Sequence, residues 1–233
     1  MIRHLQTVAA QRTNDNQCRA VTDLATVAFF FLLRVGEYTM PASNRRTRTV
    51  QFRLCDVTFY RLGVVLPLTA PLESLLSATG VTLNIDNQKN GTRGETIHQH
   101  RLVGNMVCPV AALARRVVAI RATVGASASS PISLLPDGSH VTAKMIRTAV
   151  RGAVQDLSLH RIGIKASDVG SHSLRAGGAM AMKLNGCDLV TIMKGGRWTS
   201  LTFLTYIHNQ IAHLGANITG RMASQVPFFC FAP

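Results

Sequence analysis

The sequence predicts an α+β protein that is mostly helical and contains one small antiparallel sheet of three strands. Helical periodicity covers most of the chain, whereas β-branched and aromatic residues gather between residues 49 and 103. An Asn-Gly dipeptide inside that region is a strong hairpin signal and favours antiparallel pairing. Because 47% of the 233 residues are hydrophobic, the chain can bury one sizeable core without a second domain.

The first expected helix carries the most apolar stretch of the chain. Residues 1–20 have few apolar positions and are expected to form a linker or a frayed helix. A helix is then expected from Thr22, which can cap it, to Tyr38. The run from Leu24 to Leu33 within it has ten residues, too few to cross a bilayer, and therefore indicates a buried helix.

Three segments are strand candidates, namely Thr49–Tyr60, Val81–Ile85 and Thr96–Val103. The last two are separated by a turn sequence, Asn-Gln-Lys-Asn-Gly, at residues 87–91. The sequence therefore predicts a hairpin with Lys89 at or beside its tip.

Two further helices are expected in the middle of the chain. Pro109 suits the first position of a helix, which is expected over residues 109–121. A loop rich in glycine, alanine and serine follows at residues 125–130, and a second helix is expected from Val141 to Leu157.

The charge of the chain points to an acidic polymer as partner. The net charge is +14, with 25 lysines and arginines against 11 acidic residues, and five of the basic residues are lysine. Arginine presents a planar fork that matches phosphate, so this bias favours contact with a nucleic-acid backbone. A structural RNA-binding protein would fit the charge equally well. Arg115 and Arg116, on the helix after Pro109, are expected to lie outside any catalytic set.

The cysteines and histidines do not form a metal-binding pattern. The five cysteines are odd in number, scattered and without a C-x-x-C pair, which indicates free thiols in a reducing, intracellular protein. Residues 1–20 also lack the continuous apolar stretch of a signal peptide. His98 and His100 alternate on a strand candidate and are interpreted as DNA-facing polar residues. We therefore expect no metal and no cofactor.

The most informative stretch runs from Ser171 to His208 and reads SHSLRAGGAMAMKLNGCDLVTIMKGGRWTSLTFLTYIH. His172 and Arg175 are three residues apart, so on a helix they project from one face, and Ser171 is expected to cap that helix. A guanidinium can grip phosphate oxygens while an imidazole moves a proton. Tyr206 then supplies a nucleophile for a phosphodiester, although by itself it would be read as a core tyrosine.

A second candidate arginine ends the first apolar helix in the phrase FFFLLRVGEYT. Arg34 at the mouth of a buried helix needs an anion, and Glu37, three residues later, can orient it. Alone, Arg34 could equally be an ordinary helix-end arginine that neutralises the helix dipole.

Taken together, these phrases resemble the catalytic domain of the tyrosine recombinase (phage integrase) family. The family order is an arginine in Leu-x-x-Arg-x-x-Glu, a lysine on a β-hairpin, His-x-x-Arg, a Gly-His or Gly-Trp turn, and the tyrosine. Arg34, Lys89, His172, Arg175 and Tyr206 occur here in that order. The resemblance covers residues 21–213, places a C-terminal tail at 214–233, and implies the recombinase fold.

The third motif departs from the family pattern. By count from Tyr206 it falls on Arg197, whereas by chemistry Trp198 is the better match, and this choice stays open at the level of sequence. The form of this region looks most like recombinases of Crypton and DIRS-like mobile elements, which would imply a nuclear protein. The helical DNA-clamping domain that usually precedes the catalytic domain is missing, so a fragment or a reduced relative is expected.

The resemblance also implies a mechanism. Tyr206 would attack the scissile phosphate and leave a 3′-phosphotyrosyl link, while Arg34 and Arg175 hold the non-bridging oxygens. Lys89 would protonate the leaving 5′-oxygen, and His172 would take the tyrosine proton or orient the phosphate. The reaction needs no metal, since the scattered acids do not suit a two-metal nuclease.

The expected partners are double-stranded DNA and further copies of the chain in a tetrameric synapse, with no membrane. The tail, which ends in VPFFCFAP, is expected to dock on a neighbouring protomer, with folding back onto its own core as the alternative. Two other functions remain open: a type IB topoisomerase-like enzyme and a catalytically inactive DNA-binding remnant of a mobile element.

Overall fold

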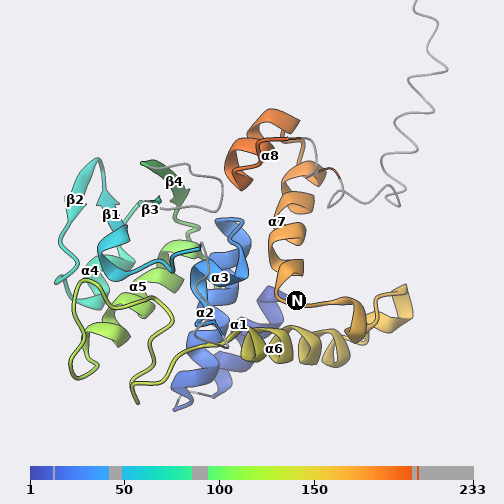
Figure 1. The fold of residues 1–233 in the computed structure, drawn as a ribbon, viewed down its shortest axis with the longest axis horizontal. Helices are drawn as coiled ribbons and strands as arrows, with labels where there is room; N and C mark the ends of the chain where they lie inside the picture. Colours follow the sequence, from blue (N-terminus) through green and yellow to red (C-terminus); the bar gives the residue numbers. More distant parts are fainter. Residues whose placement is uncertain (13, 42–48, 86–93, 201–203, 205–233) are drawn as a thin grey trace, which may run out of the picture.

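The computed structural model describes residues 1–12, 14–41, 49–85, 94–200 and 204 (Figure 1). Within them the fold is α+β and mostly helical, as predicted. The helices are α1 (Ile2–Gln11), α2 (Asn16–Phe30), α3 (Val35–Tyr38), α4 (Leu72–Leu76), α5 (Pro109–Arg121), α6 (Ala143–Asp156), α7 (His172–Leu184) and α8 (Leu189–Gly196). The strands are β1 (Val57–Arg61), β2 (Val64–Leu66), β3 (Gly80–Ile85) and β4 (Glu95–His100), and short 3₁₀ turns occupy Leu54–Asp56, Leu159–Ile162 and Ala166–Asp168.

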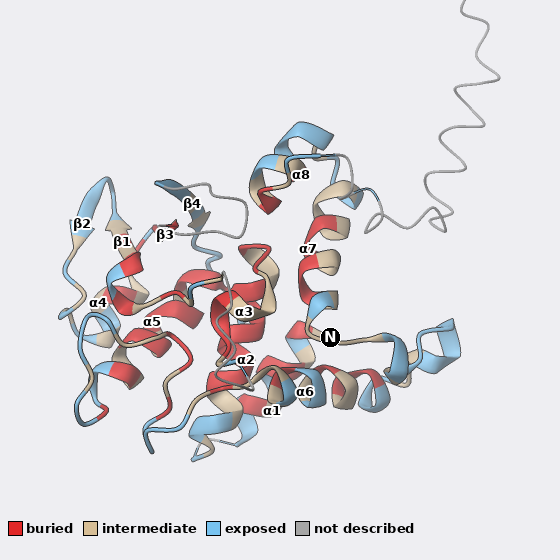
Figure 2. Cartoon of the chain, viewed as in Figure 1, coloured by how far each residue is buried: buried red, intermediate tan, exposed pale blue. Residues whose placement is uncertain are grey.

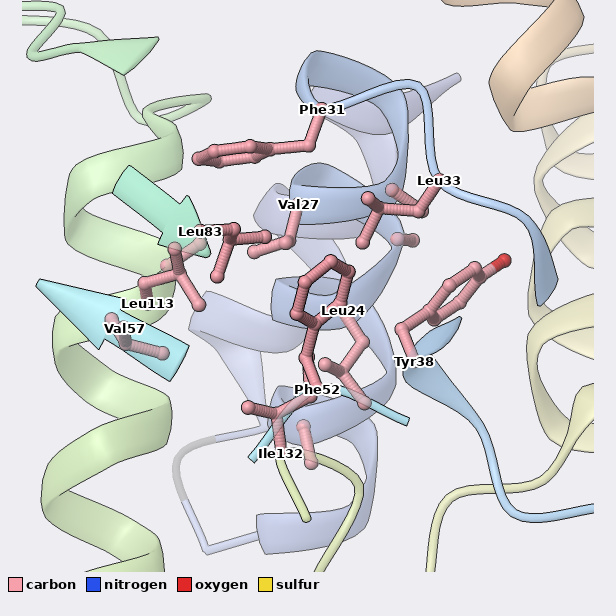
Figure 3. Close-up of a cluster of buried hydrophobic side chains, with 14 of the residues drawn as sticks. Leu24, Val27, Phe31, Leu33, Tyr38, Phe52, Val57, Leu83, Leu113 and Ile132 are labelled. Atoms are coloured by element: carbon pink, nitrogen blue, oxygen red, sulfur yellow. The ribbon is translucent and has the colours of Figure 1, made fainter. Parts of the chain in front are cut away.

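Helix α2 is the centre of the core, and α1, α5, α6 and α7 all pack against it. Its middle, from Ala20 to Ala28, is buried, as Figure 2 shows by colour, and this stretch includes the polar residues Thr22, Asp23 and Thr26. Figure 3 shows Leu24, Val27 and Phe31 of this region beside Leu83 of β3 and Leu113 of α5, so one continuous core joins the helices to the sheet.

The N-terminal residues belong to this core rather than to a linker. Helix α1 buries Ile2, Leu5 and Ala9 against α2, with a spacing that places all three on one helical face. Helix α2 also begins earlier than Thr22, because the Asp15 side chain caps it by accepting a 2.7 Å hydrogen bond from the Cys18 amide.

The single helix predicted up to Tyr38 is wrong in its second half. Helix α2 stops at Phe30, and Leu32 adopts a left-handed conformation with φ 49°, which turns the chain. A separate short helix, α3, follows, with Arg34 at its N-cap position. Arg34 thus opens a new helix instead of closing the apolar one.

The sheet has four strands, in the order β2-β1-β3-β4, and all neighbours are antiparallel. The predicted count of three missed β2, whose three residues are at or near the surface and too short to show a pattern. Only the end of Thr49–Tyr60 is a strand, since a 3₁₀ turn precedes β1. The hairpin of β3 and β4 is confirmed, with Ile85 paired to Glu95. Its tip, with Lys89, lies outside the described residues.

Helices α5 and α6 match the predicted ranges closely. Helix α7 crosses α2 at close range at Gly178, where an added Cβ would collide with the Phe29 carbonyl and the Leu32 side chain. Helix α8 packs on α7 through a separate small apolar cluster centred on Ala179 and Ile192. The described part of the Ser171–His208 stretch therefore folds as a helix pair, α7 and α8, attached to the end of α2.

Candidate active site

Three segments that are far apart in the sequence meet beside the end of α2. They are the turn from Leu32 to Glu37, the first turns of α7, and the last turn of α8 with the two residues after it. Figure 1 shows α7 and α8 rising beside α3. The contacts among these segments define the candidate site.

Arg34 and Glu37 form the first part of the site. The Glu37 carboxylate accepts a 2.8 Å hydrogen bond from the backbone amide of Arg34 and a 3.3 Å bond from its guanidinium. The Arg34 side chain is 23% exposed, whereas that of Glu37 is 4% exposed. The expectation that Glu37 orients Arg34 is therefore met, and part of Arg34 can still reach solvent or a ligand.

Arg197 holds the same carboxylate from the opposite side. It donates to both oxygens of Glu37, at 3.2 and 2.9 Å, and to the Leu32 carbonyl at 3.2 Å. Its side chain is only 3% exposed, and its backbone is left-handed, with φ 57°, where α8 ends. Arg197 is thus enclosed in the protein interior by an ion pair.

Arg175 lies beneath Trp198. Its terminal nitrogens donate to the carbonyls of Leu32 and Gly196, and its guanidinium carbon lies 4.4 Å from the centre of the Trp198 ring. The residue is 2% exposed. A Cβ at Gly196 would overlap the Trp198 ring, so glycine at this position lets the ring fold over the arginine. The sequence suggests an open phosphate clamp, whereas this structure shows a covered guanidinium.

His172 lies one turn before Arg175, at the exposed start of α7. Partial burial of the ring, and then the nearby positive charge of Arg175, lower the pKa of His172 below its ordinary value. The imidazole is therefore mostly neutral at neutral pH, the form that can accept a proton. Ser171 occupies the N-cap position of α7, but its side chain makes no capping hydrogen bond.

The structure gives the two candidates for the third motif different surroundings. Arg197 pairs with Glu37, and Trp198 covers Arg175. The site thus joins Arg34, Arg175 and Arg197 through one carboxylate and the Leu32 carbonyl, a backbone group that no sequence motif indicates. Lys89 and Tyr206 lie outside the described residues.

A cleft of about 860 Å³ opens next to this cluster, between β4 and α8. Its lining includes His98, Lys194 and Trp198. The His98 ring lies 4.5 Å from that of His100, and burial, followed by the charge of His100, lowers the pKa of His98. Lys194 has no distinguishing signal in the sequence except its place three residues before Arg197.

The described residues contain no group of three or more histidine, cysteine, aspartate or glutamate side chains placed to hold a metal ion. No helix among them is long and apolar enough to cross a membrane.

No protein-family model and no curated protein matches the sequence. Two solved structures with a similar fold are complexes of the Tn1549 transposon integrase. The complex with transposon right-end DNA has a TM-score of 0.49 and 12% identity, covering 95% of this chain and 64% of that one. The complex with circular intermediate DNA has a TM-score of 0.44 and 12% identity, covering 87% and 59%. The chain thus spans less than two thirds of either integrase chain.

Proposed function

We propose that the chain is a DNA strand-transferase of the tyrosine recombinase type, which cleaves and rejoins DNA through a 3′-phosphotyrosyl intermediate. The observation that carries the proposal is that Arg175 binds the Leu32 carbonyl of the turn that carries Arg34, with His172 one helical turn before Arg175. These are the residues that the ordered motifs select, and folding brings together two that are far apart in the chain.

The charge of the cluster suits a phosphodiester. Arg34, Arg175 and Arg197 carry three positive charges, and Glu37 carries one negative charge, so the cluster has an excess of two positive charges in a partly desolvated setting. Such a field attracts phosphate and stabilises the additional negative charge of a five-coordinate transition state. Arg34, the arginine with an exposed portion, is the one we assign to direct contact with a non-bridging oxygen.

In the proposed reaction the Tyr206 oxygen bonds to the scissile phosphorus as the bond to the 5′-oxygen breaks. His172, which the lowered pKa keeps neutral, accepts the tyrosine proton. Lys89 gives a proton to the leaving 5′-oxygen. The bond energy is retained in the phosphotyrosyl ester, so rejoining is the reverse of these steps and needs no ATP. Double-stranded DNA is the proposed partner, with self-association into a tetrameric synapse on it.

Covalent trapping on randomised DNA tests the proposal, because it requires no defined target sequence. A pool of nicked duplexes with a randomised segment is incubated with the protein, and adducts that resist SDS are isolated and sequenced. Wild-type protein should yield adducts, and Tyr206→Phe, which removes only the hydroxyl, should yield none. Adducts that persist in Tyr206→Phe would assign the nucleophile elsewhere, and loss of reaction in EDTA would contradict a metal-independent mechanism.

The products also separate the proposal from its alternatives. A recombinase should exchange strands between two copies of the recovered site, whereas a topoisomerase-like enzyme should relax a supercoiled plasmid without joining two sites. An inactive DNA-binding remnant should retain duplex binding and give no adduct on any member of the pool.

A further inference from the structure

We infer that Arg197 is a positioning residue, which fixes Glu37 and through it Arg34, and which fastens α8 to the turn that carries Arg34. The inference deepens the proposed function and rests on it for the catalytic consequence. Arg197 is occupied by contacts within the protein, although its motif position suggests a catalytic role.

The hydrogen bonds of Glu37 are the first support. Its Oε1 accepts from the guanidinium groups of Arg34 at 3.3 Å and of Arg197 at 3.2 Å. Its Oε2 accepts from the Arg34 amide at 2.8 Å and from Arg197 at 2.9 Å. Each oxygen therefore receives two donors, which permits one orientation of the carboxylate and, because Arg34 is bound to it, restricts Arg34 as well.

The burial of the two arginines assigns their roles. Both terminal nitrogens of Arg197 are used, on Glu37 and the Leu32 carbonyl, and its side chain is 3% exposed. Arg34 bonds the same carboxylate but is 23% exposed. A phosphate that approaches from solvent can therefore touch Arg34, whereas Arg197 would have to give up a buried ion pair to reach it.

The attachment of α8 is the second support. Its buried apolar contact, Ile192, belongs to a small cluster with α7 that is separate from the main core. Near the end of α8, the polar contacts to the Leu32–Glu37 turn include those of Arg197 and those of Arg175, which binds both Leu32 and Gly196. Tyr206 follows Arg197 by nine residues. The Arg197–Glu37 ion pair thus holds in place the end of α8, from which the chain continues to the proposed nucleophile.

A kinetic double-mutant cycle tests this role. Single-turnover adduct formation on a nicked duplex recovered from the pool is measured for wild type, Arg197→Met, Glu37→Gln and the double variant. Arg197→Met should slow the reaction roughly 10²-fold with a much smaller change in duplex affinity. In the Glu37→Gln background the same substitution should cost less than about threefold, because Arg197 acts through Glu37. A loss of equal size in both backgrounds would show that Arg197 acts on the substrate directly and would overturn the inference.

Two further variants control the cycle. Arg197→Lys keeps the charge but loses the planar fork, so it should recover part of the rate. Arg161→Met removes an exposed arginine from the turn Leu159–Ile162 and should leave the rate at saturating DNA within about twofold of wild type. If Arg161→Met is as slow as Arg197→Met, loss of general positive charge explains the effect and the inference fails.

Hydrogen exchange separates this inference from the proposed function. Arg197→Met should speed exchange of the α8 backbone amides at least about tenfold, with the α5 amides as an internal reference. If wild-type protein forms no adduct but α8 loosens in this way, the proposed chemistry fails while the fastening role stands. If α8 exchange is unchanged in Arg197→Met, the fastening role fails whatever the protein catalyses.

Discussion

Arg34→Ala and Arg175→Ala should both abolish most cleavage, but only Arg175→Ala should strongly destabilise the fold. The sequence motifs predict the same role for both residues, which is to hold the non-bridging phosphate oxygens. In the structure Arg34 is a partly exposed residue on one carboxylate, whereas Arg175 is buried and bonded to two backbone carbonyls. The two substitutions therefore remove very different sets of contacts.

The magnitude for Arg175→Ala follows from those contacts. The Gly196 carbonyl loses its Arg175 donor, at about 1–3 kcal/mol, and the Leu32 carbonyl, which keeps its bond from Arg197, loses one of two donors, at about 1 kcal/mol. The stacking on Trp198 adds up to about 2 kcal/mol. Relief from burying a charge offsets part of this, leaving about 3 kcal/mol. For a chain of this size, that lowers the melting temperature by about 6–12 °C. Arg34→Ala removes an ion pair worth at most about 1 kcal/mol and keeps the amide bond to Glu37, so the shift should stay below about 4 °C.

Thermal unfolding by circular dichroism and single-turnover adduct formation measure the two effects separately. Cleavage is assayed well below both melting temperatures, where each variant should be slower by roughly 10²-fold or more. A melting temperature of Arg175→Ala within about 2 °C of wild type would refute the assigned contacts, as would an Arg34→Ala variant that melts as low as Arg175→Ala. Full cleavage activity in Arg34→Ala would refute its assigned contact with the phosphate, and full activity in Arg175→Ala would refute a contribution of its buried charge to the transition state.

Three more outcomes are expected. Gly178→Ala should destabilise the fold, because its new methyl group collides with α2, whereas Gly152→Ala on α6, where the methyl meets nothing within 4 Å, should be neutral or stabilising; urea unfolding compares them. Arg115→Met should cost about 3–5 kcal/mol at pH 7, since it strands the buried Asp23 carboxylate. Burial raises the pKa of Asp23 above the ordinary carboxyl value, so the stability that Asp23 contributes is complete below that ordinary value and is lost as pH rises through the raised pKa. Protonation removes the stranded charge in Arg115→Met, so the cost of this substitution should shrink at about pH 5. Deleting residues 222–233 should reduce recombination of two-site DNA while sparing cleavage of one site, and equal recombination by the truncated chain would exclude a docking role for the tail.

The contacts of Arg115 and Arg116 affect their use as controls. The sequence predicts that substituting either of them leaves single-turnover cleavage nearly unchanged. In the structure Arg115 binds Asp23 at 3.0 Å, and Arg116 is 2% exposed and donates to the carbonyls of Ile132 and Leu134, so substitution is expected to lower stability. Burial lowers the pKa of Arg116 to about 10. Surface arginines such as Arg161 are therefore better controls.

The sequence by itself determined the elements whose signal is local. The helix over 109–121 has a proline at its start, the sequence between β3 and β4 contains an Asn-Gly dipeptide, and His-x-x-Arg lies on one helix, so each could be predicted from neighbouring residues. The spacing of Arg34 and Glu37 likewise predicted their contact, although the structure makes it in another way. Arg34 has an extended backbone at the N-cap position of α3, and Glu37 at the third helical position accepts from its amide, as in a capping box.

Only the tertiary structure decided what depends on residues distant in the chain. Helix α2 ends at Phe30, and the Leu32 carbonyl faces two arginines that come from α7 and the end of α8. The same packing gives Arg197 and Trp198 different surroundings, whereas the sequence left the choice between them open because spacing favoured Arg197 and chemistry favoured Trp198. Burial depends on which residues cover a side chain. Arg197 is enclosed by the Leu32–Glu37 turn, more than a hundred residues away, and Arg175 by that turn together with Gly196 and Trp198. No local pattern encodes that cover, so the chemistry of the arginines was predictable from the sequence and their accessibility was not.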